Sequence, residues 1–134
     1  MTPAIDQLKK LGIAHSLHEY THDASAASYG LEAATKLGVN ADIVFKTLVV
    51  ETHTNTLAVA VLPVGHQLNL KRMAKAIGAK KVSMANPAAV SRSSGYVLGG
   101  VSPLGQKRPL PTVIDESALS HKSMYVSGGH RGLE

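Results

Sequence analysis

The sequence contains no cysteine, no tryptophan and a single phenylalanine among its 134 residues. Without cysteine the chain has no disulfide framework, no thiolate metal ligand and no thiol nucleophile. With so few aromatic side chains, a platform for stacking the bases of single-stranded nucleic acid is not expected. No apolar run approaches the roughly 20 residues of a membrane-spanning helix, and the N-terminal segment lacks the pattern of a signal peptide. We therefore expect a cytoplasmic protein that forms one domain over residues 1–134.

Positive charge is in moderate excess, with 14 Lys and Arg against nine Asp and Glu and a formal net charge of +5. The basic residues Lys71, Arg72 and Lys75 lie opposite the apolar stripe of a predicted helix, and Lys80 and Lys81 follow it. This face suits contact with a polyanion such as nucleic acid. A solvated helix face is the alternative interpretation of the same residues.

Caps and periodicity predict both helices and strands. Polar N-caps, glycine stops and helical apolar spacing predict helices over 3–11, 28–37, 70–77 and 87–90. Apolar and β-branched runs predict strands over 13–20, 44–50, 57–62, 81–84, 95–98, 112–115 and 124–127. The link between 44–50 and 57–62 is too short for a parallel crossover. We therefore expect an α+β fold, with a mixed sheet or barrel and helices outside it.

Residues 18–22 read H-E-x-x-H, the pattern of a zinc hydrolase. That chemistry needs a helix, which would bring His18 and His22 onto one face with Glu19 beside a metal-bound water. Here the segment alternates like a strand, and neither Glu32 nor Asp42 stands at a persuasive spacing for a third ligand. We therefore expect no metal site.

Lys46 interrupts the apolar run of a predicted central strand. A lysine is rarely buried without a partner, so its ammonium group must reach a cavity, a carboxylate or a ligand anion. In the functional interpretation it holds a phosphate or a developing oxyanion. In the alternative it lies on an edge strand and faces water, where it guards against aggregation.

Two glycine-rich segments, Gly99–Gly105 and Ser127–Gly132, complete the candidate site. Main-chain N–H groups near Gly99 to Ser102 can polarise a carbonyl, as an oxyanion hole does. A tight connection with no ligand is the alternative. The spacing is not that of a phosphate-binding Walker loop, and neither Ser102 nor Ser127 has an evident base beside it.

The chain resembles the YbaK family of free-standing aminoacyl-tRNA deacylases, which are related to the editing insertion of bacterial prolyl-tRNA synthetases. The resemblance runs nearly from end to end in the family's order. Lys46 and the run 99–103 are its most specific parts. The matching stretches are Thr2–Ala4, His18 with Tyr20, Phe45–Leu48, Leu68–Lys71, Gly95–Gly100, Ser102–Lys107 and Tyr125–Gly129.

The resemblance implies a mixed, β-barrel-like fold and the removal of a mischarged amino acid from tRNA without a cofactor or metal. The family's essential lysine matches Lys46, which is expected to hold the phosphate or ribose of the 3′-terminal adenosine. The residues with implied catalytic roles are Lys46, Gly99, Gly100, Val101 and Ser102. Those implied to bind substrate are Tyr20, Tyr29, Thr47, Pro103, Ser127, Gly128, Gly129 and His130, the last replacing a lysine common in the cysteine-specific branch. The candidates for tRNA binding are Lys71, Arg72 and Lys75.

In the YbaK branch the substrate is cysteine on tRNA for proline, and the protein works with prolyl-tRNA synthetase. The resemblance suggests that the substrate's own thiol attacks its ester carbonyl and forms a cyclic thiolactone. Two alternatives are a deacylase of the same fold that uses water on an Ala or Ser/Thr-like residue, and a non-catalytic module that binds tRNA or the synthetase. Family members usually continue past the second glycine-rich segment, so we expect this domain to lack their C-terminal strand and helix.

Overall fold

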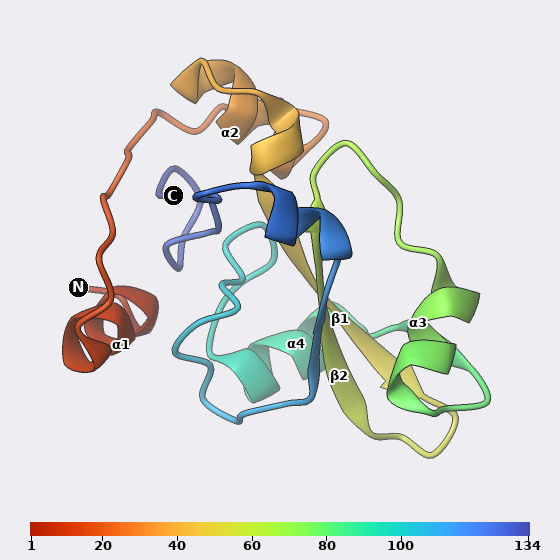
Figure 1. Cartoon of the computed structure of the whole chain (residues 1–134). Helices are drawn as coiled ribbons and strands as arrows, with labels where there is room; N and C mark the ends of the chain where they lie inside the picture. Colours follow the sequence, from red (N-terminus) through yellow and green to blue (C-terminus); the bar gives the residue numbers. More distant parts are fainter.

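The computed structural model describes all residues, 1–134, as an α+β fold in which helices surround a small central sheet (Figure 1). The α-helices are α1 (Pro3–Leu11), α2 (Tyr29–Leu37), α3 (Leu70–Ile77) and α4 (Pro87–Ser94). The strands are β1 (Phe45–Thr52), β2 (Leu57–Pro63), β3 (Val82–Met84) and β4 (Thr112–Ile114), and two 3-10 helices are η1 (Ala41–Ile43) and η2 (Glu116–Ser120). None of the helices has the length and apolar character needed to cross a membrane.

The sheet is mixed and has the strand order β3-β1-β2-β4. Strand β1 pairs antiparallel with both β2 and β3, whereas β2 pairs parallel with β4. The predicted mixed α+β architecture is therefore confirmed. Strand β1 lies between two strands only over residues 50–52, where it pairs with β3; Lys46 lies opposite Leu62 of β2 and has no β3 partner, so the strand order by itself does not decide between the two interpretations of this lysine.

The helices begin and end where their caps predict. The side chains of Thr2, Ser28, Asn69 and Asn86 each accept a hydrogen bond from a main-chain N–H in the first turn of the helix that follows. Glycines in the left-handed conformation then end all four helices, where side chains would be strained. Only α4 differs clearly from the prediction, since it continues through Ser94 rather than ending at Val90.

The core consists of three apolar clusters on the two faces and one end of the sheet. The first packs Phe45, Val49 and their β2 neighbours against Tyr96 and Val101. The second packs the opposite face of the sheet, including Val50, against Met73 and Ala74 of α3. The third joins α2 to the start of β1 through Ala33, Ala34, Val44 and Val64. The N-terminal end of β1 thus lies where α2 meets the sheet.

Three predicted strands are wrong. Segment 13–20 is extended but makes one isolated bridge, between Glu19 and Leu133, and residues 13–17 are exposed. Segment 124–127 makes one parallel bridge, between Tyr125 and Val44, and segment 95–98 is irregular and leads into a turn at Leu98 and Gly99. Apolar alternation alone does not make a strand, because a strand also needs a continuous partner for its main-chain groups.

Candidate functional site

A cavity of about 250 Å³ lies between the start of α2, the start of β1 and both glycine-rich segments. It brings together six residues that the sequence predicts for the site, from segments far apart in the chain. These residues are Tyr29, Lys46, Thr47, Gly99, Val101 and Ser127. The other residues that line it are Ala27, Ser28, Gly30, Phe45, Leu48, Leu98 and Glu134.

Lys46 enters this cavity from β1 without a protein partner. Its side chain is half-buried, and it makes no ion pair, since both ion pairs of the structure belong to Glu32. Desolvation by burial lowers the pKa of its ammonium group. Because a half-buried cation without a counter-charge is unfavourable, an anion that reached this cavity would relieve the cost. The arrangement favours the functional interpretation of Lys46.

The loop that contains Gly99 has two main-chain N–H groups without a protein acceptor, on residues that line the same cavity. Gly99 has φ +85°. The N–H of Gly100 donates to the carbonyl of Val97 at 3.0 Å and closes the turn, whereas the N–H groups of Gly99 and Val101 donate to no protein group. Gly99 and Val101 both line the cavity, so they are the better candidates for polarising a carbonyl.

Tyr29 and Arg131 hold this loop in place. The Arg131 guanidinium donates through Nε at 2.9 Å and through Nη2 at 2.6 Å to the carbonyl oxygen of Leu98. It also stacks on the Tyr29 ring, with Cζ at 4.5 Å from the ring centroid. This stacked guanidinium is a cation–π contact of the kind that arginine favours. The first residue of α2 is thereby tied to the residue that precedes Gly99.

Several predicted site residues support the cavity without lining it. Ser102 is fully buried, and its Oγ accepts from the N–H of Leu104 at 3.2 Å, so its hydroxyl has a structural partner. Gly100 packs against the main chain of His130, and a Cβ added at Gly100 would stand 2.7 Å from the Cα atom of His130. Pro103 follows in the same half-buried loop. These residues fix the path of the loop rather than face the cavity.

The second glycine-rich segment folds back on itself beside the first. The N–H of Gly128 donates to the carbonyl of Leu133 at 2.8 Å, and the N–H of Gly129 donates to Ser127 Oγ at 3.1 Å. His130 is exposed and its Nδ1 lies 2.9 Å from the carbonyl oxygen of Arg131. Of this segment, only Ser127 lines the cavity.

Glu134 is a cavity residue that the sequence interpretation missed. Its main chain pairs with that of His18 through two hydrogen bonds of 2.9 Å. Glu134 thereby lines the same cavity as Lys46. Tyr20 lies close enough for the Glu134 charge to affect it. Burial, and after it this charge, raise the pKa of the Tyr20 hydroxyl. No local pattern identifies such a residue, since the pairing joins opposite ends of the chain.

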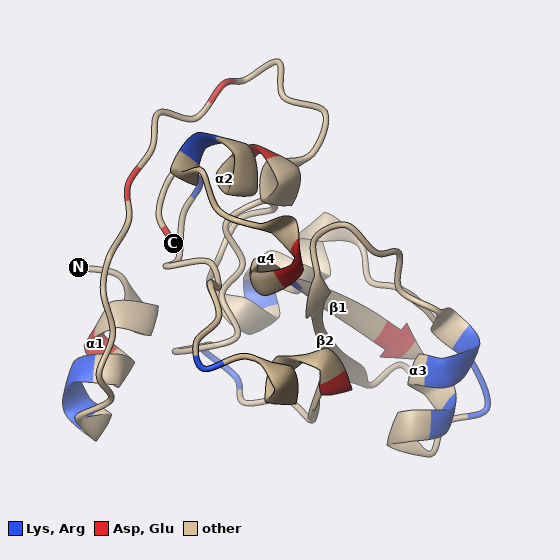
Figure 2. Ribbon diagram, turned by 45° about the horizontal axis from the view of Figure 1, so that its top comes forward, with Lys and Arg blue, Asp and Glu red and all other residues tan.

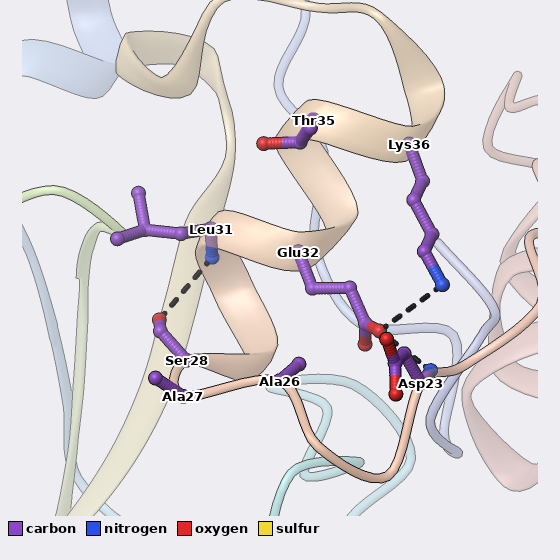
Figure 3. A pocket seen from close by; sticks show the side chains of 8 residues that line it. All are labelled: Asp23, Ala26, Ala27, Ser28, Leu31, Glu32, Thr35 and Lys36. Carbon is purple, nitrogen blue, oxygen red and sulfur yellow. Dashed lines mark hydrogen bonds and ion pairs between the residues drawn. The ribbon is translucent and has the colours of Figure 1, made fainter.

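The second histidine of the H-E-x-x-H pattern, His22, contacts the buried carboxylate of Glu32 on α2, which also pairs with Lys36. Figure 3 shows Glu32 with Lys36 and Asp23. His22 Nδ1 lies 2.7 Å from Glu32 Oε1, Lys36 Nζ lies 3.3 Å from Glu32 Oε2, and the N–H of Asp23 donates to Glu32 Oε2 at 2.6 Å. The segment is extended rather than helical, and no group of three metal-ligating side chains is present. Glu32 is thus a structural anchor beside an open hollow of about 330 Å³.

Replacing Glu32 with glutamine is expected to lower the free energy of unfolding at neutral pH by about 1–3 kcal/mol, because the buried side chain loses charge-assisted hydrogen bonds. Burial raises the pKa of Glu32, but the donors from Asp23, His22 and Lys36 outweigh it, so the net shift is downward from the usual 4.5. Its stabilising contribution is therefore complete above pH 4.5 and is lost as the pH falls through the lower folded pKa. Urea unfolding of Glu32→Gln and of the unmodified protein, at pH values above and below 4.5, measures this difference in the free energy of unfolding.

The matched control is Glu19→Gln, because Glu19 is exposed and its side chain makes no hydrogen bond or ion pair. The control should differ little from the unmodified protein at every pH. Equal stabilities of the two variants at neutral pH would contradict the role of Glu32 as an anchor.

The predicted tRNA-binding residues lie on α3, away from α2. Lys71, Arg72 and Lys75 are exposed, and Figure 2 shows basic residues gathered on α3 and the segment after it. The first turn of α3 contains no acidic residue. Lys71 and Arg72 in that turn oppose the helix dipole and cost roughly 0.3–1 kcal/mol each, whereas Lys75 lies in the last turn, where a basic residue is favourable. The placement of Lys71 and Arg72 is therefore not explained by helix stability.

Comparisons with known proteins identify the family of this chain. The family model described as "Aminoacyl-tRNA editing domain" matches residues 24–133. A protein of Enterococcus faecalis named "Putative Cys-tRNA(Pro)/Cys-tRNA(Cys) deacylase EbsC" is 40% identical over 101 residues, which are 75% of this chain and 62% of that protein. The chain thus spans less than two thirds of that relative's length.

Two solved structures share the fold over 98% of this chain. One is a structure described as "a putative trans-editing enzyme for prolyl tRNA synthetase", with a TM-score of 0.82, 25% identity and 81% of that chain covered. The other is a hypothetical protein, with a TM-score of 0.85, 27% identity and 85% of that chain covered. The chain belongs to the aminoacyl-tRNA editing domain family, and the resemblance to its YbaK branch is confirmed.

Proposed function

We propose that this protein is a trans-editing aminoacyl-tRNA deacylase that removes cysteine from mischarged tRNA for proline. The observation that carries the proposal is one cavity lined both by Lys46, which has no ion-pair partner, and by Gly99 and Val101, whose main-chain N–H groups donate to no protein group. The names of the relative from Enterococcus faecalis and of the trans-editing structure support the same substrate class.

The proposed reaction needs no nucleophile from the protein. The cysteinyl sulfur of the substrate attacks its own ester carbonyl, a four-membered thiolactone forms, and the thiol proton passes to the departing 3′-oxygen of tRNA. Lys46 holds the phosphate or ribose of the terminal adenosine. The N–H groups of Gly99 and Val101 stabilise the oxyanion that develops on the carbonyl oxygen. Placement and charge stabilisation can each supply several kcal/mol of the barrier reduction.

A panel of tRNAs charged with cysteine, alanine, serine, threonine and proline tests this function. We expect rapid deacylation of Cys-tRNA(Pro) and little action on Pro-tRNA(Pro). Blocking the cysteine thiol by S-alkylation should stop the reaction, because the nucleophile is lost. Hydrolysis of the S-blocked substrate, or of Ala- or Ser-tRNA at a similar rate, would instead favour the deacylase that uses water.

The tRNA itself is proposed to lie over α3. Changing Lys71, Arg72 and Lys75 together to glutamate should raise KM for tRNA with little change in kcat. The salt dependence of binding should weaken by up to about one unit of log–log slope for each phosphate contact removed. The stability of the variant should change little, because glutamate at positions 71 and 72 favours the first turn of α3 whereas glutamate at position 75 disfavours its last turn.

A charge-matched control for this variant changes Lys9, Lys10 and Lys122 to glutamate, since these three lysines are exposed and lie outside α3. The same change in KM for both triple variants would show a non-specific effect of net charge and contradict an α3 interface.

Prolyl-tRNA synthetase is the proposed protein partner, because it produces the mischarged tRNA. The proposed location is the cytoplasm, where that tRNA is used.

A further inference from the structure

Arg131 approaches the first glycine-rich segment from a tight turn in the second. The N–H of Leu133 donates to the carbonyl of His130 at 3.3 Å, which puts Arg131 at the second position of that turn. A Cβ added at Gly99 would stand 2.6 Å from Arg131 Nε, and one added at Gly100 would stand 3.1 Å from the main-chain nitrogen of Arg131. Glycine at both positions is therefore needed for Arg131 to come this close.

The guanidinium group of Arg131 binds a single main-chain atom. Its Nε and Nη2 donate to the carbonyl oxygen of Leu98 at 2.9 and 2.6 Å. Stacking on the Tyr29 ring, at 4.5 Å from Cζ to the centroid, fixes the plane of the group. Leu98, Gly99 and Tyr29 line the cavity, whereas Arg131 does not. An effect of Arg131 on a bound substrate must therefore pass through these neighbours.

The carbonyl group of Leu98 and the N–H group of Gly99 are the two ends of one peptide group. Resonance joins the two ends, so electron density drawn toward the oxygen leaves the N–H more positive. Hydrogen bonds in such a chain strengthen one another, and donors from a cation are the strongest. The N–H of Gly99 donates to no protein group. One end of this peptide group thus meets a cation, and the other end is left for a ligand.

We propose that Arg131 is a positioning residue that polarises the Leu98–Gly99 peptide group and so makes the Gly99 N–H a stronger donor to the carbonyl oxygen of the substrate. This inference rests on the proposed function and deepens it. Arg131 touches neither the substrate nor the reacting atoms, and it acts through the peptide group that it binds.

The consequence is an effect on the rate of the chemical step. The carbonyl oxygen of an ester gains negative charge as it is attacked, so a stronger N–H donor stabilises the transition state more than the bound substrate. Loss of the polarising cation should therefore lower kcat and leave KM nearly unchanged. A residue that binds tRNA through its phosphates would show the reverse.

The first test compares Arg131→Met and Arg131→Lys in the deacylation of Cys-tRNA(Pro). Methionine removes the cation and its donors, and we expect kcat to fall by about tenfold, less than the roughly 100- to 1,000-fold loss when an oxyanion-hole donor is removed outright. Lysine keeps a charged donor and should recover part of this loss. Arg92→Met is the matched control, because Arg92 is exposed on α4 and does not line the cavity.

The second test separates polarisation from simple support of the loop. The amide nitrogen resonances of Gly99, Gly100 and Val101 are followed by NMR in the same variants. Loss of the donors on the Leu98 carbonyl should shift the Gly99 resonance, with much smaller changes at Gly100 and Val101. Displacement of the whole loop would shift all three.

Each other outcome contradicts the role of Arg131. A higher KM with unchanged kcat would make Arg131 a tRNA contact, and equal shifts of the three resonances would make it a structural support alone. Unfolding of both variants would likewise reduce its role to stability. If the unmodified protein deacylated no charged tRNA, the proposed function would fail, while the Gly99 resonance would still report whether Arg131 polarises the peptide group.

Discussion

Replacing Lys46 with methionine is expected to lower kcat/KM for deacylation by about 100-fold or more, the usual cost of removing a group that stabilises charge in a buried site. Methionine keeps the apolar stem and removes the ammonium group, which has no counter-charge in the protein. The same variant should be as stable as the unmodified protein or more stable. Burial lowers the pKa of Lys46 because it disfavours the charged form in the folded state, and a neutral side chain avoids that cost.

Inactivity combined with retained stability would separate a functional lysine from a structural one. Rates on Cys-tRNA(Pro) and thermal unfolding of the same preparations measure the two properties. Lys46→Arg keeps the charge and should recover part of the activity, limited by the larger planar head group. Lys122→Ala, at an exposed position, should change neither property. Near-normal activity of Lys46→Met would refute the proposed role of this residue.

Features with local causes were predictable from the sequence. The cap residues Thr2, Ser28, Asn69 and Asn86 act within one helical turn, and the structure has helices beginning after each of them. The hairpin of β1 and β2 was equally accessible, because two apolar runs separated by a short polar turn can pair only antiparallel.

Features that depend on distant pairing were not predictable. Segments 13–20 and 124–127 carry strand-like residues, but each meets only one partner residue in a bridge. Glu134 is missed for the same reason, since its burial follows from pairing with His18 across the fold. From the sequence alone, Glu134 is not distinguished from a glutamate on the solvated surface.

The candidate site was predicted in outline and sharpened in detail. Lys46, Gly99 and Val101 line one cavity, as the resemblance implies for a shared site. Their individual chemical roles stay predictions. The structure distinguishes Gly100, whose N–H closes a turn, and Ser102, which is fully buried, from the neighbours that face the cavity. A glycine pattern cannot make this distinction, because it does not show which N–H groups the fold itself uses.

Replacing Gly99 with alanine is expected to reduce both activity and stability. Gly99 has φ +85°, and an added Cβ would stand 2.6 Å from Arg131 Nε and 2.9 Å from Tyr29 Cδ2. Those side chains hold the loop through the carbonyl of Leu98 and the stacked guanidinium. Both must move, and the free N–H groups of the loop move with them. A displacement of about 1 Å can cost roughly 100-fold in rate, and we expect kcat to fall by about 10- to 100-fold.

Gly12→Ala is the control that separates backbone strain from displacement of the loop. Gly12 also has a positive φ, +67°, but nothing lies within 4 Å of an added Cβ. This control should lose about 1–2 kcal/mol of stability from strain alone, with unchanged kcat. Gly99→Ala should lose at least as much stability, because it adds the cost of moving Tyr29 and Arg131 to the same strain. If Gly99→Ala deacylated tRNA as fast as Gly12→Ala, the Gly99 loop would not be the part of the cavity that polarises the ester.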